Sequence, residues 1–280
     1  MRVTTLLAAT VVALVAGIVT GSADMAFAAA GQPTDWALGF QDSRSPVMDD
    51  LIWFDNFLLV LITAISLFVL ALLIIIMVRF NAKKNPEPSK TTHNTLIEVV
   101  WTVVPILILV VIAVPSFRLL YKQMEVPEAD LTIKAIGYQW HWGYEYPDHD
   151  GLFFESLMLE DDELAEGQPR LLATDTEVVV PVNATVRLQV TSEDVIHAWA
   201  IPSFGVKMDA VPGRLNETWF RATEVGTYYG QCSELCGIRH AFMPITVKVV
   251  TQEEFDEWIL WAKEEYAAAP SAYEVADVQR

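Results

Sequence analysis

The chain has 280 residues, a hydrophobic content of 53% and a net charge of −18. This length allows one ordinary domain in addition to membrane-spanning segments. Segment 122–280 contains 28 acidic and 11 basic residues, so it carries 17 of the 18 net negative charges. Such an acidic domain excludes nucleic-acid binding by phosphate neutralisation and favours a basic protein partner, with an attraction that weakens as salt rises.

The first 30 residues have the pattern of a signal peptide. Arg2 precedes a short apolar stretch, Leu6 to Val19, and small residues then offer cleavage sites after Ala28 or Ala30. The alternative is a membrane anchor, but the apolar stretch is too short to span a bilayer comfortably. Cleavage places the mature N-terminus outside the cytoplasm, followed by a loose, polar exported arm over 31–50.

Residues 51–121 predict a transmembrane hairpin. An uncharged run over 56–78 and a second apolar run over 99–117 are each long enough to cross a bilayer as a helix. The loop between them, 79–98, is basic, and the positive-inside rule therefore places it in the cytoplasm. Both ends of the hairpin then face outward, in agreement with the signal peptide.

After the hairpin the pattern changes to short runs rich in β-branched and aromatic residues, separated by Pro, Gly, Asn and Asp. Five or more such runs within 122–250 predict an antiparallel β-sandwich or barrel. The last segment, 251–280, begins with helical spacing of Phe255, Ile259 and Ala262, which indicates an amphipathic C-terminal helix followed by a tail.

Both cysteines of the chain lie in one short motif, with His240 and Met243 close behind Cys232 and Cys236. A disulfide would explain the cysteines on the oxidising side of the membrane, but not the histidine and methionine. A catalytic thiol would leave one cysteine unexplained, and zinc does not prefer a thioether. Thiolate, imidazole and thioether together favour an electron-transfer copper site.

The presence of two cysteines in the motif favours a site with two copper ions over a site with one. A blue single-copper site uses one cysteine, whereas two thiolates can bridge two coppers, each bound by one histidine. Besides His240, a second histidine must then come from elsewhere in the fold. His93 lies in the cytoplasmic loop, while His141, His149 and His197 lie in the exported domain. His197 is preferred because it begins a predicted strand, although spacing alone leaves His141 open.

Three longer stretches carry a resemblance to a known family. They are YQWHWGYEY, DVIHAWAIPSFGVKMDAVPGRLN and YYGQCSELCGIRHAFMPI, and the hairpin precedes them. Together they resemble subunit II of bacterial cytochrome c oxidase over nearly everything after the signal peptide. The resemblance implies an N-terminal two-helix transmembrane hairpin plus a C-terminal all-β cupredoxin-like sandwich with a C-terminal helix.

The same resemblance implies a dinuclear Cu(A) centre with two copper ions. The implied copper ligands are His197, Cys232, the backbone carbonyl of Glu234, Cys236, His240 and Met243. It also implies that the Glu234 carboxylate helps to hold a magnesium ion shared with subunit I. Without the resemblance, Glu234 would be interpreted as a solvated loop residue.

Further roles are implied for residues outside the motif. Trp140 would receive electrons from cytochrome c, and Glu98 would lie at the entrance of a proton path. The implied docking acids are Glu145, Asp148, Asp150, Glu155, Asp175 and Asp194. The simpler interpretations are a strand aromatic for Trp140, a snorkelling carboxylate for Glu98, and solvated carboxylates for the acids.

The implied function is that of an electron-entry subunit of a proton-pumping oxidase in the bacterial inner membrane, with its C-terminal domain in the periplasm. Its partners would be subunit I, subunit III, cytochrome c and membrane lipid, and oxygen reduction would occur in subunit I. No C-x-x-C-H motif for a fused haem is present. The alternatives are a membrane-tethered copper-delivery protein and a structural disulfide domain with an incidental histidine and methionine.

Overall fold

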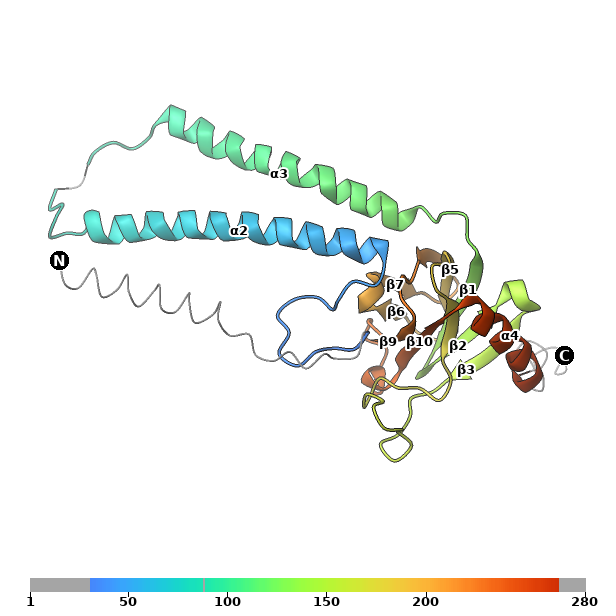
Figure 1. Ribbon diagram of the computed structural model, residues 1–280. Helices are drawn as coiled ribbons and strands as arrows, with labels where there is room; N and C mark the ends of the chain where they lie inside the picture. The colour runs from blue at the N-terminus through green and yellow to red at the C-terminus, as the bar shows by residue number, and fades with distance from the viewer. Residues whose placement is uncertain (1–30, 88, 267–280) are drawn as a thin grey trace.

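The computed structural model describes residues 31–87 and 89–266 (Figure 1). Two long helices, α2 (Pro46–Arg79) and α3 (Thr95–Met124), run side by side away from a β domain. The C-terminal helix α4 (Gln252–Tyr266) packs on this domain at the end remote from the hairpin. The predicted signal peptide and the tail 267–280 lie outside the described residues.

Both hairpin helices begin at well-formed caps. The Ser45 side chain accepts a hydrogen bond from the Met48 amide at 3.0 Å, and Pro46 occupies the first position of α2. The Asn94 side chain caps α3 by accepting from the Ile97 amide at 3.2 Å, and the Glu98 carboxylate accepts a bond from the Asn94 amide at 3.3 Å. The proton-path role of Glu98 stays a prediction, and its observed contact is this structural one.

The helices are longer than the apolar runs that predicted them. The runs 56–78 and 99–117 mark only the uncharged parts of the two helices. At the domain end of the hairpin, α2 also includes Asp49 and α3 also includes Lys122. Each helix is long and apolar enough to cross a membrane, and its apolar side chains are exposed all round. Both predicted membrane spans are therefore confirmed as helices long and apolar enough to cross a membrane.

The domain contains three sheets built from ten strands. The strands are β1 (Leu131–Tyr138), β2 (His141–Tyr146), β3 (Leu152–Ser156), β4 (Val178–Pro181), β5 (Val186–Ser192), β6 (His197–Ile201), β7 (Val206–Ala210), β8 (Asn216–Phe220), β9 (Gly226–Gln231) and β10 (Pro244–Val250). The strand orders are β3-β2-β1-β5-β8, β4-β10-β9 and β6-β7. Short 3-10 helices η1 (Pro147–His149), η2 (Pro202–Phe204) and η3 (His240–Phe242) connect them.

The strand pairing is mixed rather than wholly antiparallel. Strand β1 runs parallel to β5, with Leu131 opposite Val186, and β10 runs parallel to β4, with Val247 opposite Val178. Long connections separate the members of each parallel pair, whereas the neighbours β1 and β2 form an antiparallel hairpin. The expectation of an antiparallel sandwich therefore describes most of the pairings but not these two.

Helix α4 covers one edge of the core as its spacing predicts. Phe255, Ile259 and Ala262 are buried, and they follow the i, i+4, i+7 pattern of one helix face. Trp258 extends this contact, with its ring 5.4 Å from that of Tyr146 on β2. The helix thus closes a cluster of aromatic rings at the end of the five-stranded sheet.

The exported arm is not loose over its whole length. The carbonyl of Gly31 accepts a hydrogen bond from the Tyr229 amide at 3.0 Å, and the Ser45 hydroxyl donates to the Phe204 carbonyl at 2.7 Å. Composition predicted a loose arm over 31–50 because such polar segments lack an apolar face of their own. The arm is held instead by backbone groups of the domain, which no local sequence pattern reveals.

A second connection joins the hairpin to the domain. The Trp219 indole on β8 donates to the Lys122 carbonyl at 2.9 Å, and the Lys122 ammonium contacts Asp50 at 2.5 Å and the Pro46 carbonyl at 2.9 Å. Because Lys122 lies near the end of α3 and Asp50 near the start of α2, these bonds tie both helices to the domain at one point.

Candidate metal centre

The metal-binding motif occupies a loop that is fixed at both ends. Cys232 follows β9 directly, and the loop returns through η3 into β10, where Pro244 lies opposite Gln231. The Cys232 amide donates to the Met243 carbonyl at 3.2 Å and closes the loop base. His197 is the first residue of β6 and approaches from another sheet.

The structure brings all five predicted ligand side chains together. The two cysteine sulfurs are 3.9 Å apart; His197 Nδ1 lies 3.8 Å from the Cys232 sulfur, and His240 Nδ1 lies 3.5 Å from the Cys236 sulfur. The Met243 sulfur is 3.5 Å from that of Cys236. Each cysteine sulfur therefore has its own imidazole nitrogen, in a nearly symmetric arrangement.

The two cysteines are buried free thiols rather than a disulfide. Their sulfur separation of 3.9 Å far exceeds the S–S bond length of about 2.05 Å. His197, Cys232 and Cys236 present ligand atoms within 4.8 Å of one another, and all three residues are buried. A buried set of sulfur and nitrogen donors at this spacing can hold a soft or borderline metal ion.

Glu234 faces the cluster through its backbone. Its carbonyl oxygen lies 3.3 Å from the Cys232 sulfur, while the residue itself is exposed. This arrangement is compatible with the two roles predicted for Glu234, in which its backbone carbonyl binds copper and its carboxylate binds magnesium.

The two thiols differ in acidity. Burial raises the pKa of Cys232, but hydrogen bonds with His197 and with the backbone of Glu234 and Ala198 outweigh burial and lower this pKa to about 6. Burial and the negative charge of Cys232 raise the pKa of Cys236 to about 12. A metal ion binds cysteine as the thiolate, so binding to both sulfurs releases the protons that the pair still carries.

Asp194 orients the first histidine. Its carboxylate lies 2.9 Å from His197 Nε2 and accepts bonds from the amides of Gln139 and Val195, both at 2.6 Å. Burial lowers the pKa of His197, but Cys232 and Asp194 raise it above its ordinary value. Asp194, a predicted docking acid, thus also holds Nε2 of His197, while Nδ1 faces the Cys232 sulfur. Its role in docking stays a prediction.

The turn between β1 and β2 rests on the metal-binding loop. The Trp140 indole and the Gln139 side chain both donate to the Cys236 carbonyl, at 3.3 and 2.9 Å. A Cβ on Gly237, where φ is +128°, would lie 2.9 Å from the indole ring. Trp140 is therefore in direct contact with the loop, a position that its sequence context alone did not establish.

The other candidate histidines lie outside the cluster. His141 stacks on Tyr138 with ring centroids 4.8 Å apart, and its Nε2 is 3.5 Å from Glu155. His149 packs at the edge of α4, with its ring 5.7 Å from that of Phe255. Of the two histidines that spacing left open, His197 lies at the cysteine sulfurs and His141 does not.

Each predicted docking acid already has a partner within the chain. Two form ion pairs, Glu145 with Lys134 at 3.0 Å and Asp150 with Lys263 at 2.6 Å, and the Glu155 carboxylate lies 3.5 Å from His141 Nε2. Three accept backbone amides: Asp148 from Thr132, Asp175 from Leu157, and Asp194 from Gln139 and Val195. Their contribution to docking stays a prediction.

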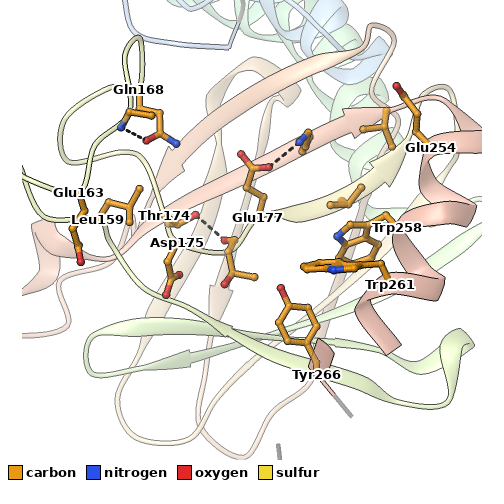
Figure 2. Close-up of a pocket in the computed structure, with 15 residues that line it drawn as sticks. Leu159, Glu163, Gln168, Thr174, Asp175, Glu177, Glu254, Trp258, Trp261 and Tyr266 are labelled. Atoms are coloured by element: carbon orange, nitrogen blue, oxygen red, sulfur yellow. Dashed lines mark hydrogen bonds and ion pairs between the residues drawn. The ribbon is translucent and has the colours of Figure 1, made fainter. Parts of the chain in front are cut away.

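A cavity of about 750 Å³ lies apart from the cluster, between the loop 157–177 and α4 (Figure 2). Trp258, Trp261 and Tyr266 line its helix side, and Glu177 pairs with Lys248 across its floor at 3.5 Å. None of the predicted copper ligands lines it. The cavity is therefore separate from the candidate metal centre.

Comparison with known proteins shows the family of the chain. The family described as cytochrome C oxidase subunit II, periplasmic domain, matches residues 131–250, and its transmembrane domain matches residues 33–119. A probable cytochrome c oxidase subunit 2 of Rickettsia bellii is 56% identical over 233 residues, covering 83% of this chain and 87% of the relative. The chain belongs to the cytochrome c oxidase subunit II family.

Further relatives have the same description. Cytochrome c oxidase subunit 2 of Cereibacter sphaeroides is 50% identical over 251 residues, covering 83% of this chain and 82% of the relative. The crystal structure of the periplasmic domain of subunit II of Bradyrhizobium japonicum cytochrome oxidase is 59% identical, covering 51% of this chain and 99% of that chain, with a TM-score of 0.48. As a member of the family, this chain is a subunit of an oxidoreductase complex with membrane-spanning helices and a periplasmic domain.

Gly137 lies directly against the His197 imidazole. A Cβ at this residue would lie 2.7 Å from Cδ2 of His197, whereas carbon atoms in contact stay about 3.5–4.0 Å apart. We expect Gly137→Ala to displace the imidazole, to reduce copper bound per chain, and to destabilise the domain by about 1–3 kcal/mol. Gly39→Ala is the matched control, because nothing lies within 4 Å of its Cβ. Full copper binding and normal stability in Gly137→Ala would contradict this assignment.

Asp194→Asn tests the orienting role separately from docking. The amide keeps the size of the side chain but removes its charge, so we expect copper affinity to fall about 10–100-fold and the His197 signals in the spectrum to shift. Glu193→Gln is the matched control, since it removes an adjacent exposed charge. If Asp194→Asn changes only the salt dependence of electron uptake, Asp194 is a docking acid and not a support for His197.

Proposed function

We propose that this chain is the electron-entry subunit of its oxidase, accepting electrons from cytochrome c at a dinuclear Cu(A) centre and passing them to haem in subunit I. The observation that carries the proposal is the pair of buried thiols 3.9 Å apart, each with its own imidazole nitrogen at 3.5–3.8 Å. Oxygen reduction, coupled to proton pumping, would take place in subunit I.

The donor set fits copper. The proposed ligands are His197, Cys232, the Glu234 carbonyl, Cys236, His240 and Met243. Two copper ions bridged by the thiolates would take up and release one electron at a time. Zinc would not make use of the thioether of Met243, and a single blue copper would leave one thiolate unused.

The chain would supply a rigid site whose geometry changes little when the centre gains or loses an electron. Burial of both cysteines and of His197 excludes water, and the amides of Cys232 and Ser233 fix the loop against Met243 and Ala198. A centre held this way reorganises little on electron transfer. Tight burial also favours retention of copper over delivery, which argues against the copper-delivery alternative.

Trp140 is proposed as the electron entry point. Its indole contacts the Cys236 carbonyl directly, and the residue is half-buried, so its ring can meet both the partner and the loop. Around it the acidic domain would attract the lysines of cytochrome c. The proposed docking acids are Glu145, Asp148, Asp150, Glu155, Asp175 and Asp194, and Asp194 would also support His197.

The remaining proposals concern the rest of the oxidase. The exposed Glu234 carboxylate would complete a magnesium site with subunit I, because carboxylates are hard ligands suited to that ion. The hairpin would lie in the bacterial inner membrane, in contact with subunit I and with lipid, and its basic loop would lie in the cytoplasm. Subunit III is a further expected partner, and Glu98 is the proposed proton-path entrance.

Copper loading of the full chain, produced without partner subunits, tests the centre itself. We expect about two copper ions per chain and an EPR spectrum of one electron shared between two metal nuclei. Cys236→Ser should abolish that spectrum, while Ser233→Ala in the same loop should keep it. One copper with a blue-type spectrum would indicate a single-copper carrier. Failure to hold copper after reduction, with the cysteines oxidised to each other, would leave the structural-disulfide alternative.

Trp140→Phe in the assembled oxidase tests electron entry. We expect electron uptake from reduced cytochrome c to slow by roughly tenfold, equivalent to about 1.4 kcal/mol of barrier, with an unchanged copper spectrum. Trp36→Phe is the control, because Trp36 lies on the arm and is 97% exposed. Equal rates in the two variants would show that electrons enter elsewhere.

A further inference from the structure

A pocket of about 550 Å³ lies between the two hairpin helices at their domain end. Its lining residues are Asp50, Trp53 and Phe54 of α2 and Pro115, Arg118, Leu119 and Lys122 of α3. Spacings of three and four residues place each set on one face of its helix, so the two faces meet across the pocket. This pocket shares no residue with the metal centre.

The pocket has an excess of positive charge. Lys122 is neutralised by Asp50, with a contact of 2.5 Å. Arg118 is exposed, and within residues 31–87 and 89–266 no acidic side chain forms an ion pair with it. Its guanidinium therefore remains as one unmatched charge, with five N–H donors suited to a phosphate or carboxylate.

The pocket lies at the level where a membrane changes from apolar to polar. The uncharged run of α2 begins at Asn56, one turn from Trp53, and that of α3 ends at Phe117, next to Arg118. Trp53 is 60% exposed, and tryptophan favours the membrane–water interface, where lipid phosphates lie. On the side of the pocket away from the β domain, both helices have exposed apolar side chains that acyl chains can cover.

We propose that this pocket binds the headgroup of an anionic phospholipid from the periplasmic leaflet, with Arg118 as the phosphate ligand. A phospholipid matches both parts of the site, because its phosphate meets the arginine while its chains follow the apolar helix faces. The anionic class is favoured because a headgroup with a net charge of −1 balances the single unmatched positive charge. The ammonium of a zwitterionic headgroup would meet Lys122 and an Asp50 carboxylate that is already paired.

Lipid analysis of the assembled oxidase that contains this chain tests the proposal. We expect Arg118→Gln to lower co-purified phosphatidylglycerol by about one molecule per chain, because one headgroup site is removed. Arg79→Gln removes the same charge at the opposite end of α2 and should leave the lipid content unchanged. Copper content and haem spectra confirm that both oxidases are assembled. No loss in Arg118→Gln, or an equal loss in both variants, overturns the proposal.

A second measurement on the wild-type chain does not depend on how the variants fold. In native mass spectrometry, the full chain is exchanged into equal amounts of phosphatidylglycerol and phosphatidylethanolamine. Preferential retention of phosphatidylglycerol supports the site as proposed. Equal retention of the two lipids, or no retained lipid, overturns it; in the latter case the arginine is available to a carboxylate of another subunit.

Discussion

The pairing of β9 with β10 is the constraint on which the centre depends. Gln231 lies opposite Pro244, and the Cys232 amide bonds to the Met243 carbonyl, so the loop that carries five of the six proposed ligands has a fixed base. A loop of this length without such closure would sample many arrangements of its sulfur and nitrogen atoms. Folding of the sheet thus orders the sulfur and nitrogen ligand atoms of the loop before any metal binds.

The β1–β2 turn adds a second support that reaches both halves of the cluster. Gln139 bonds through its backbone to Asp194, which holds His197, and through its side chain to the Cys236 carbonyl. Trp140 joins the same carbonyl. A single turn therefore connects the surface proposed for electron entry with two proposed ligands, His197 on β6 and Cys236 in the β9–β10 loop. A displacement of this turn would move both.

The sequence allowed the hairpin and the metal-binding motif to be predicted because both depend on local patterns: long uncharged runs, and ligand types at short spacing. The role of Asp194 was not predictable, since a carboxylate three residues before a histidine has many possible partners. The parallel pairing of β1 with β5 and the docking of the arm at Gly31 were missed for a similar reason. Both depend on segments that are distant in the chain and meet only in the folded domain.

The bond between Gly31 and Tyr229 has a consequence for solubility. Strand β9 is at the edge of its three-stranded sheet, and an open edge offers unpaired backbone groups to other chains. The arm covers part of this edge by accepting the Tyr229 amide, and Gly31 can do so because its φ is +87° and a Cβ would collide with Tyr228. The short polar arm therefore protects the strand that leads into the metal-binding loop from self-association.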